Sequence, residues 1–204
     1  MLTKLLTASV GSLALASAVP ANAATVYVTS LSGAQETPLV ASPAAGTAVA
    51  AIDDALSTLT LTLAFFNLRG SATGASLNCC TPLGSNTGIA INLTGFPTGT
   101  TAGGYFRVFN LLSSATYNAA FRTSHGGTAI SSRNALIAGL DSGLAYLNVR
   151  STPFPRGEIR GQLALVPTVP EPSEWLLMLA GSMLTGMMLR QQYGRRQRVR
   201  FVLA

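Results

Sequence analysis

The stretch LSTLTLTLAFFNL at residues 56–68 decides the fold class. Its large apolar side chains occupy every second position, at Leu59, Leu61, Leu63 and Phe65, and threonine or alanine stands between them. Successive side chains of a strand point to opposite faces, so this alternation predicts a strand with one buried face.

The same alternation recurs on both sides of this stretch. It appears in TVYVTS through Val26 and Val28, in GIAINL through Ile89, Ile91 and Leu93, in YLNVR through Leu147 and Val149, and in EIRGQLAL through Ile159, Leu163 and Leu165. Asp53 and Asp54 lie between GTAVAAI and the long strand and predict a hairpin turn rather than a catalytic carboxylate pair. Because Gly, Pro, Asn and Ser clusters separate the segments, we expect an all-β domain, an antiparallel β-sandwich or barrel.

Two segments have helical character. SSATYNAAF (113–121) and AISSRNALIAGL (129–140) predict one or two short helices inserted between the strands. In the second segment Leu136, Ile137 and Leu140 form a loosely apolar face, and we expect the helix to end near Gly139 or Gly143.

Charge is distributed unevenly along the chain. The body, residues 24–166, holds seven arginines and five carboxylates, so its net charge is +2, whereas the whole chain carries +6. The excess positive charge lies in the C-terminal tail. The positive-inside rule for membrane proteins explains it better than binding to nucleic-acid phosphates does. We therefore expect no nucleic-acid binding.

The two cysteines of the body, Cys79 and Cys80, are adjacent. They cannot supply the usual disulfide framework of a small secreted fold. Free thiols, an intermolecular bridge and a disulfide between the two neighbours all remain open.

The first 23 residues contain the three parts of a secretory signal peptide in their usual order. Lys4 precedes an apolar run to about Val19, and the small residues Ala21 and Ala23 end the segment, so we expect cleavage between Ala23 and Ala24.

The C-terminal end has three parts. A linker at 167–174 contains the motif Val169, Pro170, Glu171 and Pro172, whose prolines keep Glu171 extended. An uncharged run from Trp175 then predicts a transmembrane helix over 175–190, short because it reaches about 22 Å of a core that is about 30 Å thick. Residues 191–204 form a basic cytoplasmic tail under the positive-inside rule. The basic residues that end the helix and fill the tail are Arg190, Arg195, Arg196, Arg198 and Arg200.

This order of motif, apolar helix and arginine-rich end resembles the PEP-CTERM sorting signal of Gram-negative bacteria. The resemblance implies export, an inner-membrane intermediate, processing by a membrane-embedded exosortase, and then residence in the cell envelope or extracellular matrix.

Three segments of the body resemble landmarks of the chordin-type CHRD domain. They are AQETPLVASPAAGTA (34–48), GFPTGT (95–100) and ALIAGLDSGLAYLNVRSTPFPRGEIRGQL (135–163). The resemblance implies an immunoglobulin-like β-sandwich over residues 24–166 and an extracellular interaction or matrix protein.

The chain departs from that family at positions where many members have histidine. Their H-I-H is here Ser76, Leu77 and Asn78, and their Y-x-N-x-H-T has Tyr146, Asn148 and Arg150 at its first, third and fifth positions. Any role of those histidines, metal binding included, is therefore lost, and the single histidine of the chain cannot build a usual metal site. We expect no metal and no cofactor.

Glu158 and Arg160 flank Ile159, and alternation places both on one strand face. We favour a surface ion pair over the alternative, in which both join Arg150 in a charged patch for an acidic glycan or protein.

Catalytic residues are not expected. His125 lies in the turn-like TSHGGT, no G-x-S-x-G elbow occurs, and the cysteines lack C-x-x-C spacing. We expect a noncatalytic binding or structural module whose partner is an extracellular polysaccharide or another envelope protein. The alternative is a redox-active or metal-associated envelope protein, which thiol titration and metal analysis would identify.

Overall fold

The structure, a computed structural model, describes residues 24–167, 179, 181–183, 185 and 190. Contacts divide the chain into two units, Met1–Leu165 and Val166–Ala204. In the first unit the described residues form nine strands, two α-helices and two 3-10 turns. The strands are β1 (Thr25–Ser32), β2 (Ala45–Asp53), β3 (Thr58–Phe66), β4 (Ala72–Cys79), β5 (Ile89–Asn92), β6 (Gly103–Asn110), β7 (Ala145–Ser151), β8 (Ile159–Gln162) and β9 (Ala164–Leu165).

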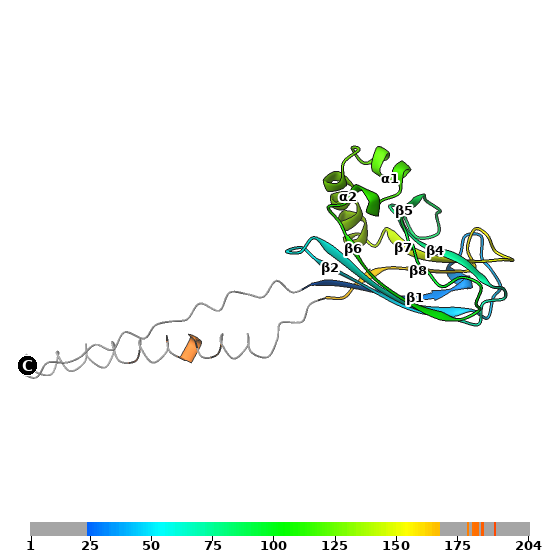
Figure 1. Cartoon of the computed structure of the whole chain (residues 1–204). Helices are drawn as coiled ribbons and strands as arrows, with labels where there is room; N and C mark the ends of the chain where they lie inside the picture. Colours follow the sequence, from blue (N-terminus) through cyan, green and yellow to red (C-terminus); the bar gives the residue numbers. More distant parts are fainter. Residues whose placement is uncertain (1–23, 168–178, 180, 184, 186–189, 191–204) are drawn as a thin grey trace, which may run out of the picture. The chain divides into compact units, whose positions relative to one another are not determined.

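Hydrogen bonds join these strands into one curled antiparallel sheet (Figure 1). Its order is β5-β4-β7-β8-β1-β2-β3-β6, and β9 also pairs with β1. The prediction of a mostly β, antiparallel domain with few helices is confirmed. The immunoglobulin-like sandwich stays a prediction.

Side chains connect the two edges of the curled sheet. The Tyr105 hydroxyl and the Arg107 Nη1 atom, both on edge strand β6, donate to the carbonyl oxygen of Thr94 at 3.1 and 2.7 Å. Thr94 follows the other edge strand, β5, and nearby Phe96 stacks on Phe65 of β3 with ring centroids 5.1 Å apart. The inner faces of the strands near both edges of the sheet therefore share one apolar core.

Strand β3 lies in this core as its alternation predicts. Leu59, Leu61, Leu63 and Phe65 are buried, and the threonines between them face outward. Full burial of one such side chain contributes about 2 kcal/mol. The strand pairs over its whole length with β2, so the hairpin predicted at Asp53 and Asp54 is confirmed: Asp53 ends β2 and Asp54 begins the turn.

Strand β1 presents the opposite face from the one predicted. Tyr27 and Leu31 lie in the core, whereas Val28 is 41% exposed. Alternation shows only that Val26 and Val28 share a face; it does not say which face is buried. The larger Tyr27 fills the core, and its hydroxyl donates to Asp141 Oδ1 at 2.5 Å.

Strands β4 and β7 are buried on both faces. Leu77, Leu147 and Val149 point into the core, while Ser76 and Asn148 are buried on the other face of the sheet. Buried polar side chains need hydrogen-bond partners. The residues that cover this second face must therefore supply some of these partners.

The helices lie together near one end of the sheet (Figure 1). SSATYNAAF forms a 3-10 turn at Ser114–Thr116 and the start of α1 (Ala119–Ser124), and the second predicted helix is α2 (Ala129–Asp141). Thr128 and Ser131 form a capping box at the start of α2. Leu136 and Leu140 are buried, as predicted, and the helix ends between the two glycines that were expected to stop it.

The second unit has few described residues, and residues 179, 181–183, 185 and 190 are helical. Among the described residues, no helix has both the length and the apolar character needed to cross a membrane. Several predicted features lie outside the described residues: Ala21 and Ala23 of the cleavage site, the motif Val169 to Pro172, and Arg195, Arg196, Arg198 and Arg200. The signal peptide, the sorting motif and the transmembrane helix stay predictions.

Candidate functional site

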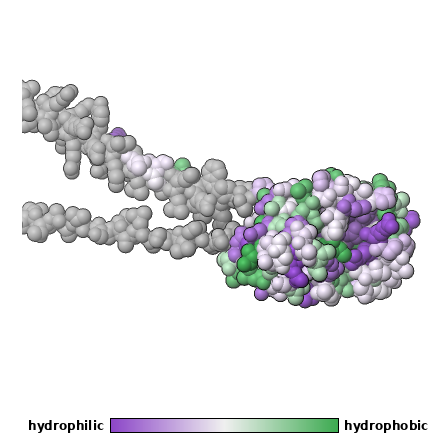
Figure 2. Space-filling view, turned by 90° about the horizontal axis from the view of Figure 1, so that it is seen from above, coloured by the Kyte–Doolittle hydropathy of each residue, from purple (hydrophilic) through white to green (hydrophobic). Residues whose placement is uncertain are grey.

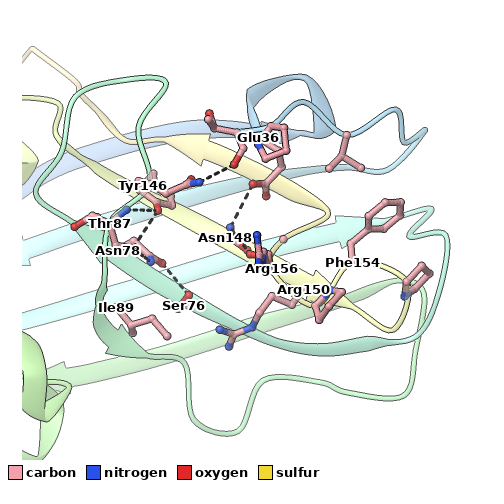
Figure 3. Close-up of a pocket in the computed structure, with 17 residues that line it drawn as sticks. Glu36, Ser76, Asn78, Thr87, Ile89, Tyr146, Asn148, Arg150, Phe154 and Arg156 are labelled. Atoms are coloured by element: carbon pink, nitrogen blue, oxygen red, sulfur yellow. Dashed lines mark hydrogen bonds between the residues drawn. The ribbon is translucent and has the colours of Figure 1, made fainter.

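A pocket of about 530 Å³ opens on the second, polar face of β4 and β7 (Figure 3). Three loops border it, at residues 36–40, 86–89 and 153–157. The volume falls within the range of about 300–1,000 Å³ that is typical of small-molecule sites. In the space-filling view, strongly hydrophilic residues gather in a band across part of the visible face of the body (Figure 2).

The strand register brings the polar side chains of the pocket together. Ser76 is opposite Asn148, and Asn78 is opposite Tyr146 in the antiparallel ladder. Residues opposite each other share a face, and the intervening residues, such as Leu77, point into the core. Two neighbouring strands inside the sheet, β4 and β7, therefore form the floor of the pocket.

Hydrogen bonds hold one side of this floor. Ser76 Oγ donates to Asn78 Oδ1 at 2.8 Å, and Asn78 Nδ2 donates to the carbonyl oxygen of Thr87 at 3.0 Å. The backbone N–H of Thr87 donates to the Tyr146 hydroxyl at 3.2 Å. These bonds anchor the 86–89 loop to the sheet and fix the orientation of the Asn78 and Tyr146 side chains.

Glu36 and Asn148 form the other side. The Glu36 side chain is 8% exposed and Asn148 is 7% exposed. Asn148 Nδ2 donates to the Arg156 carbonyl oxygen at 3.3 Å and lies 3.5 Å from Glu36 Oε2. The other two acceptors, Glu36 Oε1 and Asn148 Oδ1, are buried and have no hydrogen-bond partner. Gly157 packs so closely on both groups that a Cβ there would lie nearer than 3.0 Å to each.

Burial changes the titration of Glu36. Desolvation raises the pKa of its carboxyl to about 7, against the opposing effects of Arg160 and of the Thr37 backbone hydrogen bond. The group therefore changes charge near neutral pH.

Arg160 lies under the pocket and is fully buried. Its guanidinium stacks on the Tyr146 ring at 3.4 Å from the centroid. Its Nη1 and Nη2 atoms donate to Asn86 Oδ1 at 3.2 Å and Gln162 Oε1 at 3.4 Å. The cation thus supports Tyr146 and the 86–89 loop from below.

The predicted surface ion pair of Glu158 and Arg160 is wrong, because both side chains are fully buried and no ion pair joins them. Glu158 instead accepts hydrogen bonds from Ser42 Oγ at 2.6 Å, from the Arg69 backbone N–H at 2.7 Å and from Ser151 Oγ. Strand β8 lies inside the sheet between β7 and β1 and contacts the 3-10 turn at Gly33–Gln35, so its outer face is covered. Of the expected patch, only Arg150 lines the pocket.

Cys79 and Cys80 form a disulfide with each other, which settles the three alternatives that the sequence left open. Cys79 is buried and Cys80 is partly buried, beneath α2. A Cβ on Gly139 of α2 would lie closer than 3.0 Å to both sulfur atoms, so glycine permits this approach.

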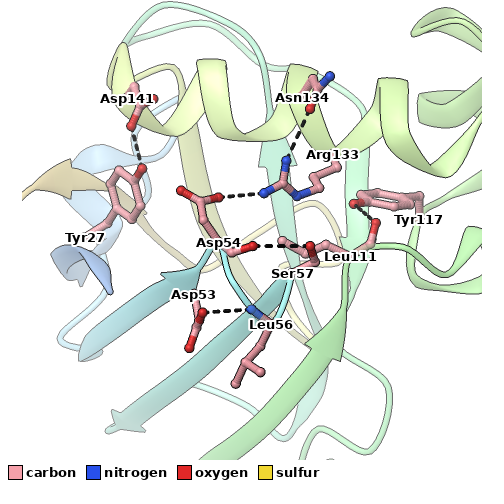
Figure 4. Close-up of polar contacts among 10 residues, drawn as sticks. All are labelled: Tyr27, Asp53, Asp54, Leu56, Ser57, Leu111, Tyr117, Arg133, Asn134 and Asp141. Carbon is pink, nitrogen blue, oxygen red and sulfur yellow. Dashed lines mark hydrogen bonds and ion pairs between the residues drawn. The ribbon is translucent and has the colours of Figure 1, made fainter. Parts of the chain in front are cut away.

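His125 and the aspartate pair lie elsewhere. His125 Nδ1 is 2.8 Å from the Phe121 carbonyl oxygen and 3.1 Å from Ser124 Oγ, and no carboxylate of the described chain hydrogen-bonds the ring. Asp53 Oδ1 accepts from the Leu56 N–H at 2.9 Å, whereas Asp54 pairs with Arg133 at 2.6 Å (Figure 4). The two carboxylates therefore have separate structural partners.

The departures from the family pattern converge in the pocket. Ser76, Asn78 and Arg150, the three positions where many CHRD domains have histidine, all line it. Within the part of the chain that the structure describes, no group of three His, Cys, Asp or Glu side chains could hold a metal ion. Sequence reasoning named these positions, assigned no site to Ser76 and Asn78, placed Arg150 only in the alternative charged patch, and gave Glu36 no role.

The fold and the pocket define a class of protein: a mostly β domain with a polar pocket on the outer face of two neighbouring strands. Residues 27–163 match the family model described as the CHRD domain. This match covers more than half of the chain, so the chain belongs to the CHRD domain family. No curated protein and no solved structure matches the chain.

Proposed function

We propose that this chain is an exported, noncatalytic binding protein of a Gram-negative cell envelope or extracellular matrix, and that the pocket on β4 and β7 is its ligand site. The supporting observation is the pair of buried acceptors, Glu36 Oε1 and Asn148 Oδ1, which have no partner. An unsatisfied buried polar group costs about 1–3 kcal/mol. A ligand that shifts Gly157 and donates to both atoms removes this cost, and the gain contributes to its affinity.

The noncatalytic part of the proposal follows from the chemistry of the lining. The hydroxyl of Ser76 donates to Asn78 and lies on the floor without a base beside it. Among the described residues, the pocket is lined by one carboxylate, by arginines, amides and hydroxyls, and by no histidine or cysteine. Such groups recognise a ligand, but they do not assemble a nucleophile with a base and an orienting group.

Localisation belongs to the same proposal. The signal peptide supports export, and the order of Pro170-Glu171-Pro172, apolar run and arginines supports a PEP-CTERM signal that an exosortase processes after a transient stay in the inner membrane. We also retain the immunoglobulin-like sandwich as the classification of the fold, supported by the common core of β2–β3 and β4–β7.

Cosedimentation with the extracellular polymer of the native host tests the binding function. We expect the purified full-length protein to sediment with the polymer, and Asn148→Ala to sediment much less. Asn134→Ala is the matched control, because Asn134 is exposed on α2 and outside the pocket. Melting curves show whether both variants are folded. If wild type stays in the supernatant, or if both variants behave alike, the pocket is not the binding site.

A further inference from the structure

The pocket combines two kinds of unpaired group. Beneath its floor lie the acceptors Glu36 Oε1 and Asn148 Oδ1, both on side chains more than nine-tenths buried and both covered by Gly157, so a ligand reaches them only when the 153–157 loop shifts. Its rim holds the guanidinium groups of Arg150 and Arg156, and neither makes a hydrogen bond or an ion pair in the described chain. A matching ligand must therefore present donors to the floor and an anion to the rim.

An apolar wall completes the lining. Phe154 is partly buried between Pro153 and Pro155, and all three belong to the loop that carries Arg156 (Figure 3). An aromatic ring beside prolines offers a flat apolar surface next to the polar floor. Ligands with one apolar face and hydroxyl edges fit this combination.

We propose that the pocket binds a uronic acid unit, a carboxylate-bearing sugar, of an extracellular polysaccharide. This ligand class rests on the proposed binding function. Ring hydroxyls donate to Glu36 Oε1 and Asn148 Oδ1, the carboxylate meets Arg150 and Arg156, and the C–H face of the ring packs on Phe154. Guanidinium and carboxylate form strong charge-assisted hydrogen bonds because their geometries match.

Other ligand classes satisfy fewer of these groups. A neutral sugar leaves both rim arginines unpaired. A phosphate dianion brings two negative charges close to Glu36, whereas a uronate brings one. An acidic peptide can reach the arginines, but neighbouring backbone N–H groups of an extended peptide point to opposite sides, whereas adjacent ring hydroxyls can donate together to two neighbouring acceptors.

Calorimetry of the full-length protein at pH 8 tests the ligand class, with a galacturonic acid trisaccharide as the probe. The matching neutral galactose trisaccharide and an acidic hexapeptide are the comparison ligands. We expect the uronate to bind at least about tenfold more tightly than either. Arg150→Gln and Arg156→Gln should each weaken uronate binding about tenfold or more, since hydrogen bonds to charged groups contribute about 1.5–3 kcal/mol. Arg69→Gln is the matched control: it removes the same charge from an exposed arginine outside the pocket and should change the affinity less than twofold.

Equal binding of the neutral trisaccharide, tighter binding of the peptide, or equal losses in all three arginine variants would overturn the uronate proposal. The cosedimentation experiment separates this failure from failure of the binding function. If wild type sediments with the host polymer and Asn148→Ala does not, while the uronate fails to bind, the function stands and the ligand class is wrong. If neither the polymer nor the uronate binds, both proposals fail.

Discussion

Glu36 gives the sharpest test of the pocket electrostatics. Its carboxyl is 8% exposed, and burial raises its pKa from 4.5 to about 7. In the unfolded chain the group is solvated and titrates near the ordinary value. Between these two pKa values the folded protein holds a proton that the unfolded chain has released, so the free energy of unfolding must fall as the pH rises from about 4.5 to about 7.

The magnitude follows from the two pKa values. One pKa unit corresponds to 1.36 kcal/mol, so the whole interval corresponds to about 3 kcal/mol. Solvent in the open pocket screens the charge, so we take about 3 kcal/mol as the upper value and about 2 kcal/mol as the lower. Above pH 7 this loss is complete, and below pH 4.5 it is absent.

Glu36→Gln keeps the shape of the side chain and removes its titration. We expect the variant and wild type to be about equally stable near pH 4.5, and the variant to be about 2–3 kcal/mol more stable at pH 8. Urea unfolding followed by near-ultraviolet circular dichroism of the tyrosines measures this difference. Fluorescence is unsuitable, because the only tryptophan, Trp175, lies outside the β domain.

Asp53→Asn is the control, since it removes one carboxylate from a hairpin turn outside the pocket. The informative quantity is the difference in unfolding free energy between Glu36→Gln and wild type at each pH. If this difference stays constant from pH 4.5 to pH 8, Glu36 does not titrate as a buried carboxyl, and the account of the pocket floor is refuted.

Four further predictions concern other parts of the chain. Thiol titration of the unfolded full-length protein should find no free thiol before reduction and two afterwards, because Cys79 and Cys80 are paired; any thiol in the unreduced sample contradicts the disulfide. Arg160→Met should raise the pKa of Glu36 further, since Arg160 now lowers it, and the pH-dependent fall in stability should extend to higher pH; an unchanged profile would show that the two groups are uncoupled. Glu158→Ala should cost about 3 kcal/mol or more in urea unfolding, because three donors lose their acceptor, and a cost below about 1 kcal/mol would contradict this network. Intact mass of the protein from extracellular fractions of the host should show a species that begins at Ala24 and ends near Pro172, whereas a membrane-bound species still ending at Ala204 would mean a permanent anchor.

The sequence predicted the strands whose apolar residues recur at every second position, and it missed β4 and β6. Strand β3 alternates regularly because its threonines face solvent. Strand β4 is buried on both faces, so alternation is lost, and β6 carries exposed apolar side chains such as Phe106 and Val108. Hydrophobic periodicity reports the difference in polarity between the two faces of a strand, and neither β4 nor β6 shows that difference.

The pocket was beyond prediction for a different reason. Glu36 and Asn148 are 112 positions apart, and they meet because β8 lies between β7 and β1 in the sheet. A single sequence contains no signal for that strand order, and nothing in AQETP distinguishes a buried glutamate from a solvated one. The same gap explains the error at Glu158 and Arg160. Arg160 lies on the covered outer face and stacks on Tyr146, whereas the Glu158 carboxylate accepts hydrogen bonds from Ser42, Arg69 and Ser151.

In β4 and β7, alternate residues serve the core and the pocket that we propose as the ligand site. Leu77, Leu147 and Val149 pack in the core, while the residues between them face the pocket. A substitution on the outer face therefore changes what the pocket recognises and leaves the core and the register intact. The three positions at which this chain departs from the histidine pattern of its family all lie on that outer face. Membership of the CHRD family thus identifies the domain, and the ligand that we propose for it rests on the pocket residues of this chain itself.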